Sequence, residues 1–171
     1  MAPILAPLAA SGRSITQIRP DQKVAKGYLG EPGDRQPALL INMDVLAPAG
    51  GVNSTLSDMI RYVQFLVDEG IHDGKRLVSA EALEETWKPQ IGGANLDGAL
   101  PDASYGLGWF VRKVGEVKIV EHGGNALGFS AYVAILPEQH LGIVMLSNVL
   151  PNPLQQSLGE QVVETLLESE R

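Results

Sequence analysis

Apolar residues recur every three or four positions across residues 55–69, which places them on one face of a helix. These positions are Leu56, Met59, Ile60, Val63, Leu66 and Val67. Thr55 and Asp58 have the spacing of a capping box, in which the hydroxyl accepts a hydrogen bond from an amide of the first turn. Gly70 comes next and suits the left-handed conformation that ends many helices. The pattern therefore predicts a helix over 55–69.

Two further helices are predicted. A shorter one runs from about Ser79, a suitable N-cap, to Trp87, and Pro89 stops it. The second begins after Asn152, with Pro153 at the first helical position, where a missing amide hydrogen costs nothing. Its apolar face consists of Leu154, Leu158, Val162, Val163, Leu166 and Leu167. This C-terminal helix can therefore pack on a neighbouring layer.

Four short apolar stretches bounded by turn residues are typical of strands. They cover residues 106–114, 117–121, 129–136 and 142–148. Their short connections favour an antiparallel meander. Residues 1–50, rich in Pro and Gly, are predicted to be loop with short elements, and 92–102 a polar loop. The sequence thus predicts an α+β fold in one domain over 1–171: a loop and helical part (1–104), then an antiparallel sheet with a C-terminal helix (105–171).

Composition and charge narrow the expected partners. The chain has 171 residues, 44% of them apolar, which is enough for one domain with a sizeable core. Its net charge of −7 argues against nucleic acid and anionic membrane surfaces as partners. The lack of cysteine removes disulfides, thiolate nucleophiles and Cys-based metal sites, and suits either redox environment. No apolar stretch approaches the roughly 18 residues of a membrane span.

The densest group of unusual residues is Glu121-His-Gly-Gly-Asn-Ala-Leu-Gly-Phe129. Its glycines let the backbone approach another group closely or turn sharply, and His122 adds a group that titrates near neutral pH. Two interpretations stay open from the spacing. One is a substrate-binding edge with His122 facing a ligand and backbone N–H groups pointing at an oxyanion. The other is a β-turn or bulge with an incidental surface histidine.

Other catalytic and metal-binding patterns are incomplete. No serine stands three residues before a lysine, and the nucleophile elbow G-x-S-x-G fails at Gly128-Phe-Ser-Ala-Tyr132. His72 and His140 are far from His122 in sequence and no H-E-x-x-H occurs, so no metal site is predicted. The glycines do not form a phosphate-binding loop, and no organic cofactor is implied. Trp109 is predicted to serve packing rather than substrate stacking.

Six segments in order resemble the β-lactamase-related serine hydrolases, which include class C β-lactamases, D-alanyl-D-alanine carboxypeptidases, D-aminopeptidases and esterases of the same fold. The segments are Ala47-Pro-Ala-Gly-Gly-Val-Asn-Ser-Thr-Leu-Ser-Asp58, Tyr105-Gly-Leu-Gly-Trp109, His122-Gly-Gly, Gly128-Phe129, Leu136-Pro137 and Leu146-Ser-Asn148. The resemblance covers the chain from about Ala25 onward. Each segment alone is ordinary, and their order and spacing carry the signal.

The resemblance implies the roles of one motif. The family uses Ser-x-x-Lys for the nucleophile and its base, Tyr-x-Asn or Ser-x-Asn for proton transfer, and Lys-Thr-Gly or His-x-Gly on the strand lining the cleft. His122-Gly123-Gly124 matches the last of these. By that match His122 orients the substrate, and the backbone N–H of Asn125 is one of two oxyanion donors, the other belonging to the nucleophilic serine.

The departure from the family is large, because neither Ser-x-x-Lys nor Tyr-x-Asn occurs. The resemblance implies that both motifs lie upstream of this segment, so we expect a C-terminal fragment with no complete catalytic set, inactive alone. Its substrate would be a small-molecule or peptide acyl compound. A second hypothesis is a non-catalytic module that binds a peptide or acyl ligand. A third is an enzyme in which Ser130 or Ser104, near His122, serves as nucleophile.

The resemblance also implies that one edge of the sheet is unpaired. In the family, upstream strands lie beside the one that corresponds to the strand between Gly142 and Asn148. Without them this apolar strand would lie at an open sheet edge, and such an edge invites pairing with another chain. We therefore expect self-association through this strand.

Overall fold

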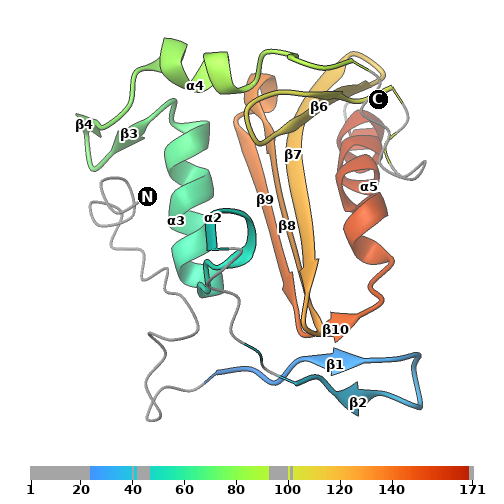
Figure 1. The fold of residues 1–171 in the computed structure, drawn as a ribbon. Coiled ribbons are helices and arrows are strands. Elements are labelled where there is room, and N and C mark those ends of the chain that lie inside the picture. The colour runs from blue at the N-terminus through green and yellow to red at the C-terminus, as the bar shows by residue number, and fades with distance from the viewer. Residues whose placement is uncertain (1–23, 40, 42–46, 93–99, 101, 170–171) are drawn as a thin grey trace.

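A five-stranded antiparallel sheet forms the centre of this computed structural model, which describes residues 24–39, 41, 47–92, 100 and 102–169 (Figure 1). The strand order is β5-β6-β7-β8-β9. The strands are β5 (Ser104–Tyr105), β6 (Phe110–Val114), β7 (Val117–Ala126), β8 (Phe129–Leu136) and β9 (Leu141–Ser147). Each strand pairs antiparallel with its neighbour. The predicted α+β class with an antiparallel sheet is confirmed.

Helices cover both faces of this sheet. Helix α3 (Leu56–Val67) packs on β8 and β9, whereas α5 (Leu154–Ser169) packs on β7 and β8 from the opposite side (Figure 1). The core under α3 includes Phe65, Leu66, Val120 and Ile135, and the core under α5 includes Ile119, Tyr132, Leu136 and Val163. The result is a three-layer arrangement in which the central strands are buried on both faces.

Smaller elements surround the three layers. They are β1 (Tyr28–Leu29), β2 (Gln36–Pro37), α2 (Ala47–Gly50), β3 (Ile71–His72), β4 (Lys75–Arg76), α4 (Ala80–Thr86), the 3-10 turn η3 (Pro137–Gln139) and β10 (Val149–Leu150). Strand β1 lies between β10 and β2 in a second, three-stranded sheet. This sheet lies below the β7–β8 turn in Figure 1. Most of the predicted 92–102 loop lies outside the described residues.

The predicted helix ends are confirmed at α3 and α5. The Thr55 hydroxyl accepts a hydrogen bond from the Asp58 amide at 3.2 Å. Gly70 follows in a left-handed conformation, with φ +84°. At α5 the Asn152 Oδ1 atom accepts from the Leu154 amide at 3.1 Å. These caps satisfy amides that have no partner within the helix.

The Thr55 cap gives a measurable prediction. Thr55→Ala is expected to lower the free energy of unfolding by about 1 kcal/mol, because the Asp58 amide loses its acceptor. Ser57→Ala, at an exposed position in the same turn, is the matched control and should change it by less than about 0.5 kcal/mol. Chemical denaturation of both variants measures the difference. Equal effects would mean that the cap contributes nothing.

Strand β9 lies at one edge of the five-stranded sheet among the described residues. Its Gly142 lets α3 approach closely, because a Cβ atom there would lie 2.1 Å from Cγ1 of Val63. Strand β9 spans Leu141–Ser147, one residue earlier than predicted. Its place at the edge agrees with the sequence prediction, and the self-association expected from it stays a prediction.

The connection between the two central strands differs from the sequence prediction. The predicted strand ended at Glu121, with the glycine-rich cluster after it as a connection. Strand β7 instead continues to Ala126, and only Leu127 and Gly128 form the turn, with φ +51° and +78°. Positive φ at both central residues is typical of a tight two-residue hairpin turn. Residues 122–125 therefore lie in a strand.

The start of β6 also differs from the prediction. The strand expected from Gly106 begins at Phe110, because 106–109 form a turn closed by a hydrogen bond from the Gly106 amide to the Trp109 carbonyl, at 2.8 Å. The short strand β5 precedes this turn and was not predicted. None of the helices among the described residues has both the length and the apolar character to cross a membrane.

Candidate functional site

Strand β7 lies between β6 and β8 and extends beyond the end of its pairing with β6. The pairing with β6 ends at Phe110 opposite Glu121, whereas the pairing with β8 continues to Ala126 opposite Phe129. Among the described residues, 122–126 therefore have a strand partner on the β8 side only. A strand edge of this kind presents backbone N–H and C=O groups that a ligand can bind. The four candidate residues, 122–125, lie within this edge.

His122 lies at the start of the free edge, against two aromatic rings. Its Nε2 atom is 3.2 Å from the Tyr105 hydroxyl. The centroid of the His122 ring lies 5.6 Å from that of Phe110, which in turn lies 4.7 Å from that of Tyr105. Strand pairing places Tyr105 opposite Phe110 and so brings the hydroxyl to the histidine. Residues far apart in sequence thus meet at this end of the edge.

Burial against these rings lowers the pKa of His122 below its ordinary value of 6.5, because it disfavours the charged imidazolium, and a hydrogen bond to the Gly123 backbone only partly opposes this. The residue keeps an exposed surface. The neutral ring is thus the favoured form at neutral pH. It can accept or donate a hydrogen bond at the edge without carrying a charge.

This pKa shift predicts a pH dependence of stability. Between the pKa of folded His122 and about 6.5, the unfolded chain binds more protons than the folded one, so stability falls as pH decreases through that window. His122→Asn should therefore lose less stability than the wild type between pH 7.5 and 5. His140→Asn, at an exposed turn position, is the control and should follow the wild type. If the unfolding free energies of the wild type and His122→Asn change with pH in parallel, the pKa of His122 is not lowered.

The two glycines of the motif have different surroundings. A Cβ atom at Gly123 would lie 2.3 Å from Nε2 of Gln155, whose amide donates to the carbonyls of Ala131 (3.1 Å) and Gly124 (3.4 Å). Gln155 of α5 therefore covers one face of the strand. A Cβ atom at Gly124 would meet nothing within 4 Å. Gly124 is thus the position in the motif where space is open for a ligand.

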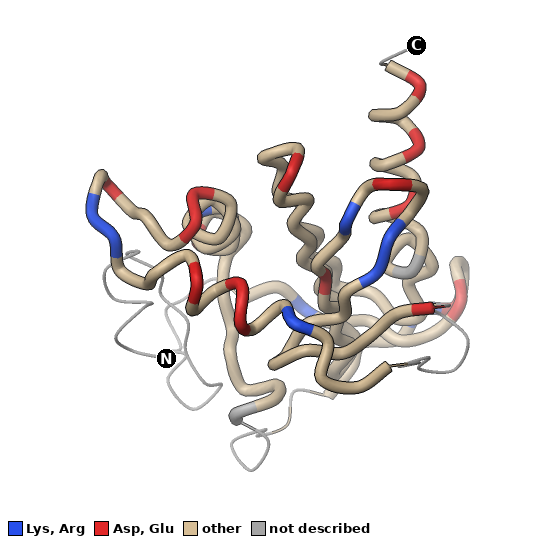
Figure 2. The backbone as a smooth tube through the Cα atoms, turned by 90° about the horizontal axis from the view of Figure 1, so that it is seen from above, with Lys and Arg blue, Asp and Glu red and all other residues tan. Residues whose placement is uncertain are grey.

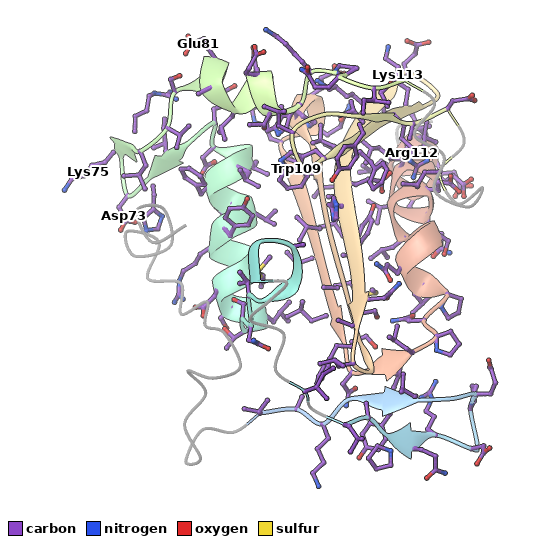
Figure 3. The ribbon with its side chains drawn as sticks, in the orientation of Figure 1. Asp73, Lys75, Glu81, Trp109, Arg112 and Lys113 are labelled. Carbon is purple, nitrogen blue, oxygen red and sulfur yellow. The ribbon has the colours of Figure 1, made fainter. Side chains whose placement is uncertain are left out.

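A buried polar network lies directly before the edge. Glu121 accepts hydrogen bonds from Nε of Arg112 and from the Tyr132 hydroxyl, and Arg112 also donates to Glu160 of α5 at 2.9 Å. Arg112 lies between the sheet and α5 in Figure 3. Burial opposes the charge on Arg112, but the bond to Glu121 raises its pKa. Burial also raises the pKa of Tyr132, and the Glu121 carboxylate adds to this.

This network fixes β7 at the point where the free edge begins. Glu121 is 2% exposed and immediately precedes His122, and Gly159 leaves the space for it, since a Cβ atom there would lie 2.3 Å from the Tyr132 hydroxyl. The network therefore ties β6, β7, β8 and α5 together beneath the candidate site.

Neither of the two serines considered as nucleophiles is hydrogen-bonded to His122 in the described structure. Ser130 is 2% exposed, lies opposite Asn125, and accepts a hydrogen bond from Nδ2 of Asn152 at 2.9 Å. Ser104 lies opposite Val111. Among the described residues the side chain that hydrogen-bonds to His122 belongs to Tyr105. Among the described residues, therefore, no base hydrogen-bonds to either serine as the third hypothesis requires.

The remaining candidates have structural surroundings. His72 lies 3.5 Å from the Asp73 carboxylate, and His140 has a left-handed conformation after η3. Trp109 packs against the core under α3, as its label in Figure 3 shows. No group of three or more His, Cys, Asp or Glu side chains able to hold a metal occurs in the described parts of the chain.

Sequence reasoning missed two residues of the site. Tyr105 contacts His122 and Gln155 covers Gly123. A signal for Tyr105 was present, because it begins the segment Tyr105-Gly-Leu-Gly-Trp109 that carries part of the resemblance. Gln155 gave no signal, since a glutamine in the first turn of a predicted helix is ordinary.

Comparisons with known proteins agree on the class. The "Beta-lactamase" of Yersinia enterocolitica is 27% identical over 176 residues, and "Penicillin-binding protein 4" of Amycolatopsis lactamdurans is 28% identical over 130; the alignments cover 88% and 74% of this chain. Among solved structures, an octameric penicillin-binding protein homologue from Pyrococcus abyssi matches 94% of the chain with a TM-score of 0.72 at 23% identity. A class C β-lactamase matches 93% with a TM-score of 0.63 at 22% identity.

The fold is thus the α+β fold of the penicillin-binding protein and β-lactamase structures. A sequence model of the Beta-lactamase family matches residues 4–167, and the chain belongs to that family, which supports a serine hydrolase lineage. The resemblance inferred from the six segments is therefore confirmed. The chain spans only 34% and 45% of the lengths of the two curated relatives, and 36% and 46% of the two solved chains.

Proposed function

We propose that this chain supplies the substrate-binding edge of an acyl-serine hydrolase site. The observation that carries the proposal is the free edge of β7 over 122–126, with His122 at its start and open space at Gly124. Membership of the Beta-lactamase family supports the reaction class. The substrate would be an acyl compound, either a small ester or amide or a peptide.

In this proposal the residues of the edge bind and orient the acyl group. The backbone N–H of Asn125 stabilises the oxyanion that forms when a serine hydroxyl attacks the acyl carbon. His122 holds a substrate polar group by hydrogen bonding. The nucleophilic serine and its lysine come from residues outside this sequence, which contains no Ser-x-x-Lys or Tyr-x-Asn. The 171 residues alone would therefore bind without turnover.

A ligand titration followed by NMR tests the binding edge. N-acetyl-D-alanyl-D-alanine amide, added to ¹⁵N-labelled chain, is expected to shift the amide signals of His122, Gly124 and Asn125. The amide of Gly115, in the turn that precedes the opposite end of β7, serves as the internal control. Shifts confined to the edge would support the proposal. No shifts at millimolar ligand, or shifts only elsewhere, would overturn it.

The second candidate function is a non-catalytic module that binds a peptide or acyl ligand. The edge supports it as well, because binding to a free strand edge needs only backbone hydrogen bonds and space for side chains. Adding an upstream segment in trans and measuring hydrolysis distinguishes the two functions. If an upstream segment with Ser-x-x-Lys restores hydrolysis when added in trans, the chain is part of an enzyme; if only binding is ever observed, it is a module.

We also propose self-association through β9, supported by the place of this strand at the sheet edge. Leu146, which is 40% exposed, is the position to change. Leu146→Lys is expected to abolish the association, because a charged side chain on an edge strand opposes strand pairing. Light scattering at micromolar concentration should give an oligomer for the wild type and a monomer for the variant. A monomeric wild type would contradict the proposal.

A further inference from the structure

The contact between Tyr105 and His122 determines where the imidazole carries its proton. A phenol hydroxyl is a stronger donor than a neutral imidazole N–H, and an unprotonated ring nitrogen is a good acceptor. The Tyr105 hydroxyl therefore donates to Nε2 of His122 across their 3.2 Å separation. The ring proton is then on Nδ1.

The acidic groups nearest to His122 are paired with other residues. On β7 itself, the Glu121 carboxylate is held by Arg112 and Tyr132. The elements packed against the ring contribute Tyr105 from β5 and Phe110 from β6. No acidic partner among the described residues therefore stabilises an imidazolium at this edge.

The cations of the neighbouring strands are engaged elsewhere. Strands β5 to β8 contain Arg112, Lys113 and Lys118. Arg112 pairs with Glu121 and Glu160, Lys113 lies 3.8 Å from Glu116, and Lys118 lies over the Trp87 ring at 5.8 Å. Figure 2 shows acidic residues recurring along α5, the helix that leads to the C-terminus. Each cation of strands β5 to β8 thus already has a partner away from His122.

We propose that Tyr105 is a positioning residue that fixes the neutral His122 ring with its proton on Nδ1, so that the edge selects uncharged acyl esters and amides over ligands with a carboxylate at this position. This inference deepens the proposed function and rests on it. A neutral edge gains no ion pair from a carboxylate and still has to remove its water, so the uncharged ligand binds better.

The first test measures which ring nitrogen of His122 carries the proton. Long-range ¹H–¹⁵N NMR of the wild type should show His122 protonated on Nδ1 and not on Nε2 at pH 7.5. Tyr105→Phe should produce a mixture of both tautomers, because the hydroxyl that donates to Nε2 is lost. Tyr28→Phe, on β1, is the matched control and should leave the tautomer unchanged. A wild-type ring protonated on Nε2 would overturn the inference, even if the Tyr105 variant fails to fold.

The second test measures selectivity. At pH 7.5 the wild type should bind N-acetyl-D-alanyl-D-alanine amide more tightly than the corresponding acid. His122→Lys introduces a cation and should reverse the preference, favouring the acid by roughly twofold to fivefold. If both ligands bind the wild-type edge and the acid binds as tightly or more tightly, the inference fails and the proposed function stands. If neither ligand binds, the proposed function itself fails, and this inference with it.

Discussion

Replacing Glu121 with glutamine is expected to lower the free energy of unfolding by about 3–5 kcal/mol, the range for a buried ion pair that loses one partner. Arg112 and Glu121 are both buried, and Arg112 would keep its charge in an apolar layer without the carboxylate that compensates it. Tyr132 would lose its charged acceptor as well. Chemical denaturation of Glu121→Gln against the wild type measures the loss.

Glu160→Gln is the matched control for this prediction. Glu160 binds the same arginine, through Nη1 at 2.9 Å, but its side chain is 44% exposed. Its loss should cost less than about 1 kcal/mol, because water can replace an exposed partner. Arg112→Met combined with Glu121→Gln should recover part of the stability, since the uncompensated charge is gone. Equal losses for the two glutamine variants would show that burial does not determine the value of this network.

The second large effect is expected at Gly106, in the turn that precedes β6. A Cβ atom there would lie 2.4 Å from the Thr86 carbonyl oxygen and 3.0 Å from that of Lys88. The Thr86 carbonyl also accepts a hydrogen bond from the Leu107 amide at 2.9 Å. Gly106→Ala must move the end of α4 or weaken this bond, so we expect a loss of about 2–3 kcal/mol in unfolding free energy.

The effect should also reach the site, because Gly106 follows Tyr105. Displacement of this turn is expected to weaken the contact between Tyr105 and His122, which the tautomer measurement detects. Gly92→Ala is the control: this glycine is exposed, and a Cβ atom there meets nothing within 4 Å. Its unfolding free energy should change by less than about 0.5 kcal/mol. If Gly106→Ala changes the unfolding free energy by a similarly small amount, the end of α4 can move without loss of stability, and the prediction is wrong.

The helices were predictable because their signals are local. The apolar stripe of α3 and the caps at Thr55 and Asn152 depend on residues within one or two turns of each other. The antiparallel sheet followed from short connections between apolar stretches. These features depend on residues close together in sequence, so the pattern of apolar and polar residues was enough to predict them.

The candidate site was less predictable because it depends on pairing across the sheet. The glycines after His122 favour a turn locally, yet residues 122–126 stay extended because β8 pairs with all of them. The hydrogen bond between Tyr105 and His122 joins residues 17 apart in sequence. His122 to Asn125 were identified through the resemblance, whereas Tyr105 and Gln155 required the tertiary arrangement.

The central claim is that this chain carries a substrate edge and no reactive serine. Intact-mass analysis after incubation of the chain with a fluorophosphonate, and separately with a penicillin, tests it most directly. We predict an unchanged mass with both reagents, because no serine in the sequence stands three residues before a lysine and His122 contacts neither Ser104 nor Ser130 by a hydrogen bond in the described structure. A single stoichiometric adduct, located on one serine by peptide mapping, would contradict the account.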